Sequence, residues 1–372
     1  MTMFSLVAGG LLALPPLLVL VVTAPVVAIL SIPALAVFLF RKPTACQKVQ
    51  AETNARHAII TGGSSGIGLC IAQDCVRRGF QRVTILARNP EGLAAAKKAL
   101  QEMAKKSAVT VEIQALSVDV ADPAALTKLA PKIFEKYSDD TTRFATYLFC
   151  CAGITYPEYF ENIPSATFAK IVNTNQLGAI YTVQACLPHM KAGTIQFCSS
   201  ICGQIGVFGY ASYSPTKFAL RGFAEVLHME LCNRPIHVQT AYPPDTETPG
   251  FAVENLTKPI ETGLISEQAG LSQPADVASI MVKEAVADSP RFTVYFTFDE
   301  WMLASLTAGF GPVSTLFDAV SQIAGASIFR FVAMFYLVDW WRLVRNHQNK
   351  NKTSVAEKES VSTENTSDSK EE

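Results

Sequence analysis

The sequence predicts an α/β protein: a doubly wound parallel sheet with hydrophobic, membrane-associated segments at both ends. Between residues 55 and 300, short apolar runs alternate with helical patterns. Repeated strand–helix units of this kind imply a parallel sheet covered by helices on both faces. Hydrophobic residues make up 49% of the 372-residue chain. Their excess is concentrated near the two ends, which we therefore assign to the membrane.

The N-terminal segment, residues 1–40, contains no charged residue and four prolines that would kink a helix. A bilayer span needs about 20 apolar residues, so the segment has room for one tilted helix or a kinked re-entrant pair. A cleaved signal peptide is disfavoured, because no basic region precedes the apolar run and the run is too long. We expect a retained membrane anchor. The basic residues Arg41, Lys42 and Lys48 place the following domain in the cytosol.

A second hydrophobic segment covers residues 299–341 and is followed by Arg342 and Arg345. Its basic flank predicts a membrane hairpin or helices that lie in the interface. Packing onto the catalytic domain or a dimer partner stays open, because Asp318 and Arg330 are costly in lipid. The polar residues 346–372 are predicted to be a disordered tail.

The middle region, residues 55–298, is predicted to be one catalytic domain, large enough for an ample core. Short apolar runs predict its buried strands, at residues 57–60, 83–86, 109–120, 147–150, 195–197 and 238–241. Helical periodicity predicts its helices, at residues 66–78, 91–105, 123–135, 166–190 and 213–231.

Composition disfavours several classes of function. The net charge is −1, and no basic block suits a nucleic acid. The five histidines are scattered, so no metal site is expected. Nine cysteines without a CxxC pair are typical of free thiols in a reducing compartment.

A glycine-rich turn follows the first strand, in the run Thr61-Gly62-Gly63-Ser64-Ser65-Gly66-Ile67-Gly68. Glycines at 62, 66 and 68 allow a tight turn, close approach of a pyrophosphate and close packing of helix on strand. The phosphates would lie at the helix N-terminus. The spacing differs from GxGxxG, but the strand–turn–helix context favours a dinucleotide site formed by Gly62, Ser64, Ser65, Gly66, Ile67 and Gly68.

The end of the second strand indicates which dinucleotide binds. Enzymes that use NAD place an acid there on the ribose 2′-hydroxyl, whereas this chain has Arg88. An arginine beside Ser64 suits a 2′-phosphate, so NADPH is favoured. A surface arginine without a ligand is the alternative. Asp119, after the third strand, is expected either to contact the adenine or to cap the strand end.

Three residues predict acid–base chemistry. Tyr213 and Lys217 are four residues apart, so they share a helix face, and Ser200 precedes the tyrosine by thirteen residues. An ammonium near a phenol favours the phenolate, and a serine hydroxyl can hold a carbonyl oxygen. The set therefore predicts proton transfer to or from a carbonyl substrate.

The glycine turn, this trio and the strand–helix order together resemble the short-chain dehydrogenase/reductase family over residues 55 to about 295, which implies a Rossmann-type fold. Further matches are Cys151-Ala152-Gly153, Asn175 in a helix, and residues 243–248 beside the nicotinamide. Cys151 and Pro244 depart from the family's usual asparagine and glycine.

The resemblance implies a role for each matching residue. NADPH supplies hydride, Tyr213 supplies the proton and Ser200 binds the carbonyl oxygen. Lys217 lowers the tyrosine pKa and binds the nicotinamide ribose, while Asn175 holds a water that links Lys217 to solvent. Thr248 is a cofactor contact.

A narrower likeness within the family is carried by residues 206–210, 241–251, 254–255 and 257–259 and by the hydrophobic ends. It implies reduction of a long-chain lipid ketone, 3-oxosphinganine, to sphinganine in sphingolipid synthesis, at the cytosolic face of the endoplasmic reticulum. Another lipid ketone (a steroid, retinoid or long-chain 3-ketoacyl group) and a non-catalytic membrane scaffold are the alternatives. Residues 246–273 are expected to form either a substrate lid or a surface insertion, and a homo-oligomer stays open.

Overall fold

The computed structural model describes residues 55–135 and 144–367. The anchor predicted over residues 1–40 therefore lies outside the described part of the chain.

A seven-stranded sheet forms the centre of the molecule, with all neighbouring strands parallel and in the order β3-β2-β1-β4-β5-β6-β7. The predicted fold class is confirmed. The strand order reverses between β1 and β4, where Thr61 lies opposite both Leu86 and Cys150. Ligands of such sheets bind at this switch point, beyond the carboxyl ends of the strands. The strands are β1 (Ala55–Thr61), β2 (Arg82–Ala87), β3 (Glu112–Ser117), β4 (Phe144–Cys150), β5 (Gly193–Cys198), β6 (Ile236–Ala241) and β7 (Thr293–Val294).

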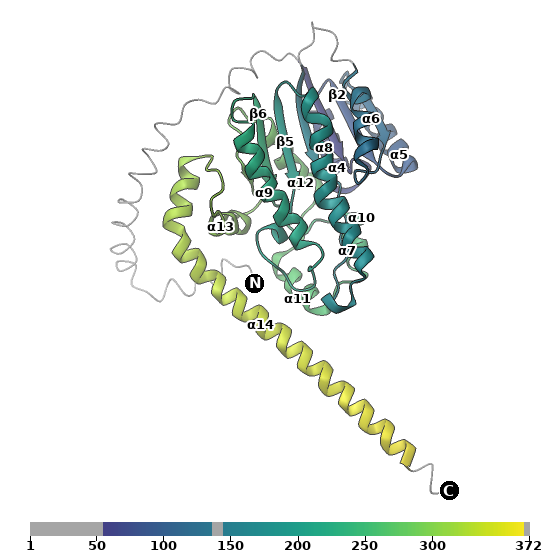
Figure 1. Cartoon of the computed structure of the whole chain (residues 1–372), viewed down its shortest axis with the longest axis vertical. Coiled ribbons are helices and arrows are strands. Elements are labelled where there is room, and N and C mark those ends of the chain that lie inside the picture. The colour runs from purple at the N-terminus through teal and green to yellow at the C-terminus, as the bar shows by residue number, and fades with distance from the viewer. Residues whose placement is uncertain (1–54, 136–143, 368–372) are drawn as a thin grey trace.

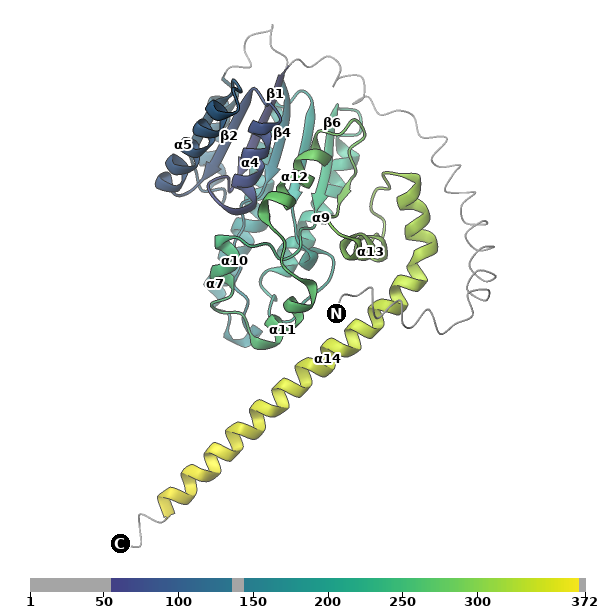
Figure 2. The same ribbon diagram turned by 180° about the vertical axis from the view of Figure 1, so that it is seen from behind.

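Helices cover both faces of the sheet, as Figures 1 and 2 show from opposite sides. Two hydrophobic cores result, one under each helical layer. Because both faces are covered, the inner strands are apolar along most of their length rather than alternating. One layer holds α4 (Gly66–Arg77), α5 (Pro90–Lys106) and α12 (Pro274–Ala285), and the other holds α6 (Pro123–Phe134), α8 (Gly178–Cys186) and α9 (Ser214–Glu230).

The structure differs from the predicted elements in two places. The helix expected over residues 166–190 is divided into α7 (Ser165–Ile171), a π-helical turn (Val172–Leu177), α8 and a 3₁₀ turn (Leu187–His189). The elements α12 and β7 were not expected. A strand of two residues that pairs only with β6 is too short to leave a periodic pattern in the sequence.

Residues 246–273 form an ordered insertion between β6 and α12, at the carboxyl end of the sheet. It contains α10 (Pro249–Glu254) and α11 (Ile260–Ala269). Its two ends are joined, because Ser272 N–H donates to the Asp245 carbonyl at 2.8 Å and Glu247 N–H donates to the Ser272 carbonyl at 2.9 Å. We call these residues the lid segment.

The C-terminal region consists of α13 (Phe298–Leu306) and the long α14 (Leu316–Ser367). Residues 316–349 form a helix long and apolar enough to cross a membrane, and few of these residues are buried. Yet α14 contacts the rest of the protein at both ends of this stretch. Trp301 of α13 stacks on Phe317 at 5.6 Å, and Trp340 Nε1 donates to Gln268 of α11 at 3.1 Å.

The tail predicted to be disordered over residues 346–372 differs from that expectation up to Ser367, where α14 ends, and its last five residues lie outside the described part of the chain. A helix that is already nucleated gains one hydrogen bond for each residue added, without a new nucleation cost. Residues 355–359, Val-Ala-Glu-Lys-Glu, include several good helix formers. Composition alone therefore underestimated the helix.

Candidate active site

A cleft of about 1070 Å³ opens at the carboxyl end of the sheet. It is bounded by the ends of β1, β4 and β5, by the N-terminal ends of α4 and α9, and by the lid segment. Asn175 and Asp119 are the predicted site residues that do not line it. The predicted residues that do line it are Gly62, Ser64, Ser65, Gly66, Ile67, Gly68, Arg88, Ser200, Tyr213, Lys217 and Thr248.

The glycine turn at the start of α4 needs glycine for specific reasons. Gly62 and Gly66 have positive φ angles of 70° and 54°. A Cβ on Gly68 would lie 2.4 Å from the carbonyl oxygen of Gly62. The first turn of α4, which begins at Gly66, carries N–H groups without intrahelical partners. This wall of the cleft can therefore receive a pyrophosphate.

Thr61 joins the turn to β4, a role for which no motif in the sequence is a signal. Its hydroxyl oxygen accepts hydrogen bonds from Cys151 N–H at 3.0 Å and Ala152 N–H at 3.1 Å. The backbone that carries Cys151, where an asparagine was expected, is thus braced by a residue of β1.

Arg88 follows β2 with a half-exposed side chain that lines the cleft. Its Nη1 lies 4.0 Å from Asp119 Oδ2, a distance at which an exposed ion pair contributes little. Asp119 also accepts from Ala121 N–H at 3.0 Å. Asp119 therefore caps the turn after β3, and its contact with the adenine stays a prediction.

Tyr213, Lys217 and Ser200 come together around the ends of β5 and α9. Lys217 is buried, and its Nζ donates to the Cys198 carbonyl at 2.8 Å and lies 5.3 Å from the centre of the Tyr213 ring. Ser200 accepts from Cys202 N–H at 3.2 Å, at the start of a 3₁₀ turn (Ile201–Gly203).

The pKa of Tyr213 differs from the expectation that Lys217 lowers it. Burial raises the pKa of Tyr213 well above its usual value, and hydrogen bonding to Ser200 acts in the opposite direction. The Lys217 ammonium donates to the Cys198 carbonyl and lies over the Tyr213 ring. Burial in turn lowers the pKa of Lys217. The tyrosine therefore keeps its proton at neutral pH, which is the form that a proton donor requires.

Asn175 lies in the π-helical turn and is buried. Its Oδ1 accepts from Ile154 N–H and its Nδ2 donates to the Ile154 carbonyl, both at 2.8 Å. Nδ2 also lies 3.3 Å from Thr216 Oγ1. The side chain therefore holds the loop after β4 against α9, beside Lys217. Turns of π-helix are frequent at functional sites.

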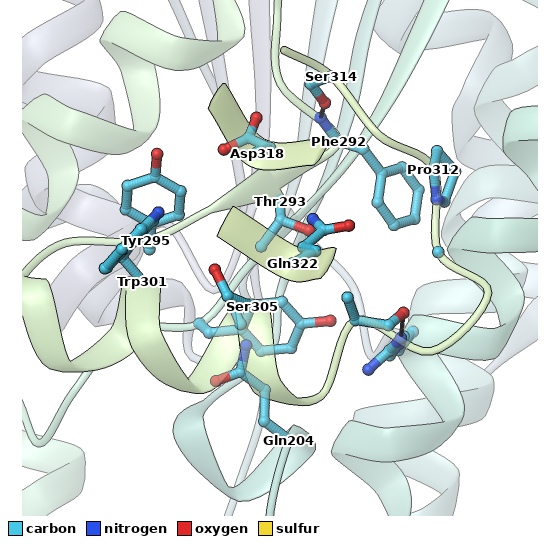
Figure 3. Close-up of a pocket in the computed structure, with 15 residues that line it drawn as sticks. Gln204, Phe292, Thr293, Tyr295, Trp301, Ser305, Pro312, Ser314, Asp318 and Gln322 are labelled. Carbon is cyan, nitrogen blue, oxygen red and sulfur yellow. Dashed lines mark hydrogen bonds between the residues drawn. The ribbon is translucent and has the colours of Figure 1, made fainter. Parts of the chain in front are cut away.

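A second cavity, shown in Figure 3, lies between the domain, α13 and the start of α14. Its volume of about 30 Å³ suits a single water, not a substrate. Gln204, Trp301 and Asp318 are among its lining residues. The first turns of α14 are thus packed against polar side chains of the protein. This agrees with the alternative that the segment containing Asp318 packs onto the catalytic domain.

Comparison with known proteins places this geometry in a family. The pattern of the short chain dehydrogenase family matches residues 56–258. The chain is 43% identical to a 3-dehydrosphinganine reductase of Danio rerio, over 79% of this chain and 87% of that protein. It is 40% identical to a 3-ketodihydrosphingosine reductase of Bos taurus, over 78% and 85% of the two chains.

Solved structures agree with the fold. An actinorhodin polyketide ketoreductase with NADPH has a TM-score of 0.55 and 26% identity, over 63% of this chain and 91% of that one. An alcohol dehydrogenase of Thermococcus sibiricus has a TM-score of 0.54 and 21% identity, over 66% and 98%. The chain belongs to the short chain dehydrogenase family, and within it resembles the 3-dehydrosphinganine reductases along most of its length.

Proposed function

We propose that this protein is an NADPH-dependent reductase that converts 3-oxosphinganine to sphinganine, a step of sphingolipid synthesis. The observation that carries the proposal is the meeting of Tyr213, Ser200 and Lys217 with the glycine turn in one cleft. The similarity to 3-dehydrosphinganine reductases over most of the chain supports the choice of ketone.

The cleft fits a dinucleotide with a 2′-phosphate. A Cβ on Gly62 would lie 3.0 Å from Ala152 N, so only glycine lets the turn pack this closely on the backbone after β4. Ser64, Ser65 and Ile67 line the same wall and would contact the phosphates. Arg88 is exposed enough to reach a 2′-phosphate with little desolvation cost. Thr248, whose hydroxyl caps α10, would contact the nicotinamide end.

When bound, NADPH supplies a hydride to the carbonyl carbon of the substrate. Ser200 and the Tyr213 hydroxyl bind the carbonyl oxygen and stabilise the negative charge that develops on it. Tyr213 then donates its proton to this oxygen. General acid catalysis of this kind increases the reaction rate by about 10²–10⁴-fold. Lys217 compensates the charge left on the phenolate, and Asn175 keeps the loop beside Lys217 in place.

The position of the C-terminal helix suggests how a lipid ketone reaches the cleft from the membrane. Residues 316–349 of α14 touch the protein at both ends, through Phe317 with Trp301 and through His347 Nδ1, which lies 3.3 Å from Glu261 Oε1 of α11. Because it contacts α13 at one end and α11 at the other, this stretch of α14 lies beside the protein. Exposed apolar side chains occur along this stretch, at Phe317, Ile323, Ile328, Phe331, Met334, Phe335, Val338 and Trp341.

The lid segment adds the exposed side chains of Leu256, Ile260 and Leu264. Figures 1 and 2 show α11 beside α14 in both views. This arrangement supports an interfacial position with the lid close to the lipid, and the resemblance to 3-dehydrosphinganine reductases favours the cytosolic face of the endoplasmic reticulum. The substrate could then enter the cleft without full transfer of its chain into water.

A substrate panel tests the proposed function. The purified protein with NADPH is given 3-oxosphinganine, a retinal and a ketosteroid, and oxidation of NADPH and the lipid products are measured. We expect rapid turnover of 3-oxosphinganine to sphinganine. Faster turnover of the retinal or the steroid would assign the cleft to another lipid ketone, and no turnover of any ketone would favour the scaffold.

A further inference from the structure

A carboxylate lies beside the proposed proton donor and has no role in the mechanism above. Glu254 ends α10 and lines the cleft, with its side chain 12% exposed. Its Oε1 accepts a hydrogen bond from the Tyr210 hydroxyl and lies 2.9 Å from Lys258 Nζ. Among the described residues, both of these contacts fall on Oε1 and none falls on Oε2. One oxygen of the carboxylate is therefore available to a ligand.

Glu254 is close to the reacting centre. Its partner Tyr210 has its ring 5.7 Å from the ring of Tyr213. The charge of Glu254 is also one of the causes, after burial, that raise the pKa of Tyr213. The carboxylate therefore acts electrostatically on the same hydroxyl that would bind the substrate carbonyl.

The charges around Glu254 leave a negative balance in this part of the cleft. Asp245, a second carboxylate, lines the cleft and accepts from the Ser266 hydroxyl. The nearby cation, Lys258, is only 6% exposed and lies 4.3 Å from the centre of the Phe251 ring. Beside Glu254, two carboxylates therefore face one bound ammonium, while the Lys217 ammonium of the same cleft is held by the Cys198 carbonyl. This part of the cleft can accept one further cation. Such a cation would be costly to bury without a partner.

The ketone proposed as substrate carries a cation in the corresponding place. Its amino group is on the carbon next to the carbonyl carbon. With the carbonyl oxygen on Tyr213 and Ser200, the ammonium is three covalent bonds from that oxygen. It must therefore lie near Tyr213, on the side where the lid segment supplies Glu254 or on the side of the cofactor.

We propose that Glu254 binds the ammonium group of the amino ketone and selects such substrates against neutral ketones of the same chain length. This inference rests on the proposed function and adds the group that recognises the polar end of the substrate. The alternative role, in which Glu254 only fastens the lid through Tyr210 and Lys258, predicts no such selectivity.

The substitution Glu254→Gln separates the two roles. A glutamine keeps the shape and an oxygen that accepts from Tyr210, but it removes the charge. Two substrates are compared: 3-oxosphinganine and 1-hydroxyoctadecan-3-one, in which hydrogen replaces the ammonium. We expect kcat/KM for the amino ketone to fall about 10- to 100-fold, as for loss of a hydrogen bond between charged groups. For the neutral ketone we expect a change of less than about threefold.

Two further variants serve as controls. Glu267→Gln makes the same chemical change at an exposed position of α11 that does not line the cleft, and should leave both substrates unaffected. Glu254→Asp keeps the charge and should retain part of the selectivity. Equal losses for both substrates in Glu254→Gln, with NADPH affinity unchanged, would mean that the residue only supports the lid and would overturn the inference.

A measurement on the unaltered protein covers the case in which Glu254→Gln does not fold. Inhibition by octadecylamine is compared with inhibition by octadecanol, and the amine is expected to bind at least tenfold more tightly. Equal inhibition would refute ammonium recognition. Failure of the proposed function looks different, because the unaltered protein would then reduce neither ketone with NADPH.

Discussion

Replacing Gly68 by alanine tests whether the glycine turn holds the cofactor. The added Cβ would lie 2.4 Å from the Gly62 carbonyl oxygen, whereas such contacts are essentially never closer than 3.0 Å. The turn and α4 must therefore separate by at least 0.6 Å. The atoms in the way belong to the backbone of Gly62 and Gly63, so no flexible side chain can move aside. Overpacking of this kind costs about 1–3 kcal/mol, so we expect the Kd of NADPH to rise about 5- to 150-fold.

The assay is fluorescence titration of NADPH against the full chain, with thermal unfolding measured in parallel. Gly222→Ala is the matched control, because a Cβ there meets nothing within 4 Å. Gly222 lies inside α9, where alanine should stabilise by up to about 1 kcal/mol. If Gly68→Ala bound NADPH as tightly as the unaltered protein, the turn would not be the pyrophosphate site.

Three other predictions follow from the cleft and from α14. Arg88→Ala should raise the Kd of NADPH about 10-fold and leave that of NADH unchanged, since an exposed phosphate contact lies at the weak end of charged hydrogen bonds; equal effects on both would exclude a 2′-phosphate contact. The rate of reduction should fall as pH rises through the pKa of Lys217. Because burial lowers this pKa, the midpoint of the fall in rate should lie below the usual lysine value of about 10.4. A rate that is constant to pH 11 would show that the ammonium is not needed. In vesicles of brominated lipid, the tryptophan fluorescence of the full chain should be quenched, and the exposed Trp341 should account for most of it; loss of the quenched signal in Trp301→Phe rather than in Trp341→Phe would contradict the interfacial position of α14.

Much of the fold could be predicted because its signals are local. Buried parallel strands are continuous apolar runs, and the turn after β1 needs glycines at fixed offsets. The lid segment is different. Its helices α10 and α11 are short, and they are held by contacts between distant residues, such as Thr262 Oγ1 donating to the Phe208 carbonyl at 2.9 Å. Helices this short leave no periodic pattern in the sequence from which they could be predicted.

The site was predictable to the extent that its chemistry follows a spacing. Tyr213 and Lys217 are four residues apart, and in the structure Tyr213 is the N-cap of α9 while Lys217 lies in its first turn. The direction of the Lys217 ammonium was not predictable, because the Cys198 carbonyl that it binds belongs to β5. The same holds for Thr61, whose partners Cys151 and Ala152 follow β4, and for the contact of Glu254 with Tyr210. Only the folded chain brings these pairs together.

The central claim is that Tyr213 delivers the proton to a ketone in the cleft. The most direct test is a single-turnover measurement with NADPH already bound, comparing the unaltered protein with Tyr213→Phe on 3-oxosphinganine. We expect the variant to bind NADPH with unchanged affinity and to lose about 10²–10⁴-fold in the rate of hydride transfer. Substantial turnover by Tyr213→Phe, within about tenfold of the unaltered rate, would contradict the account, because general acid catalysis would then come from another group.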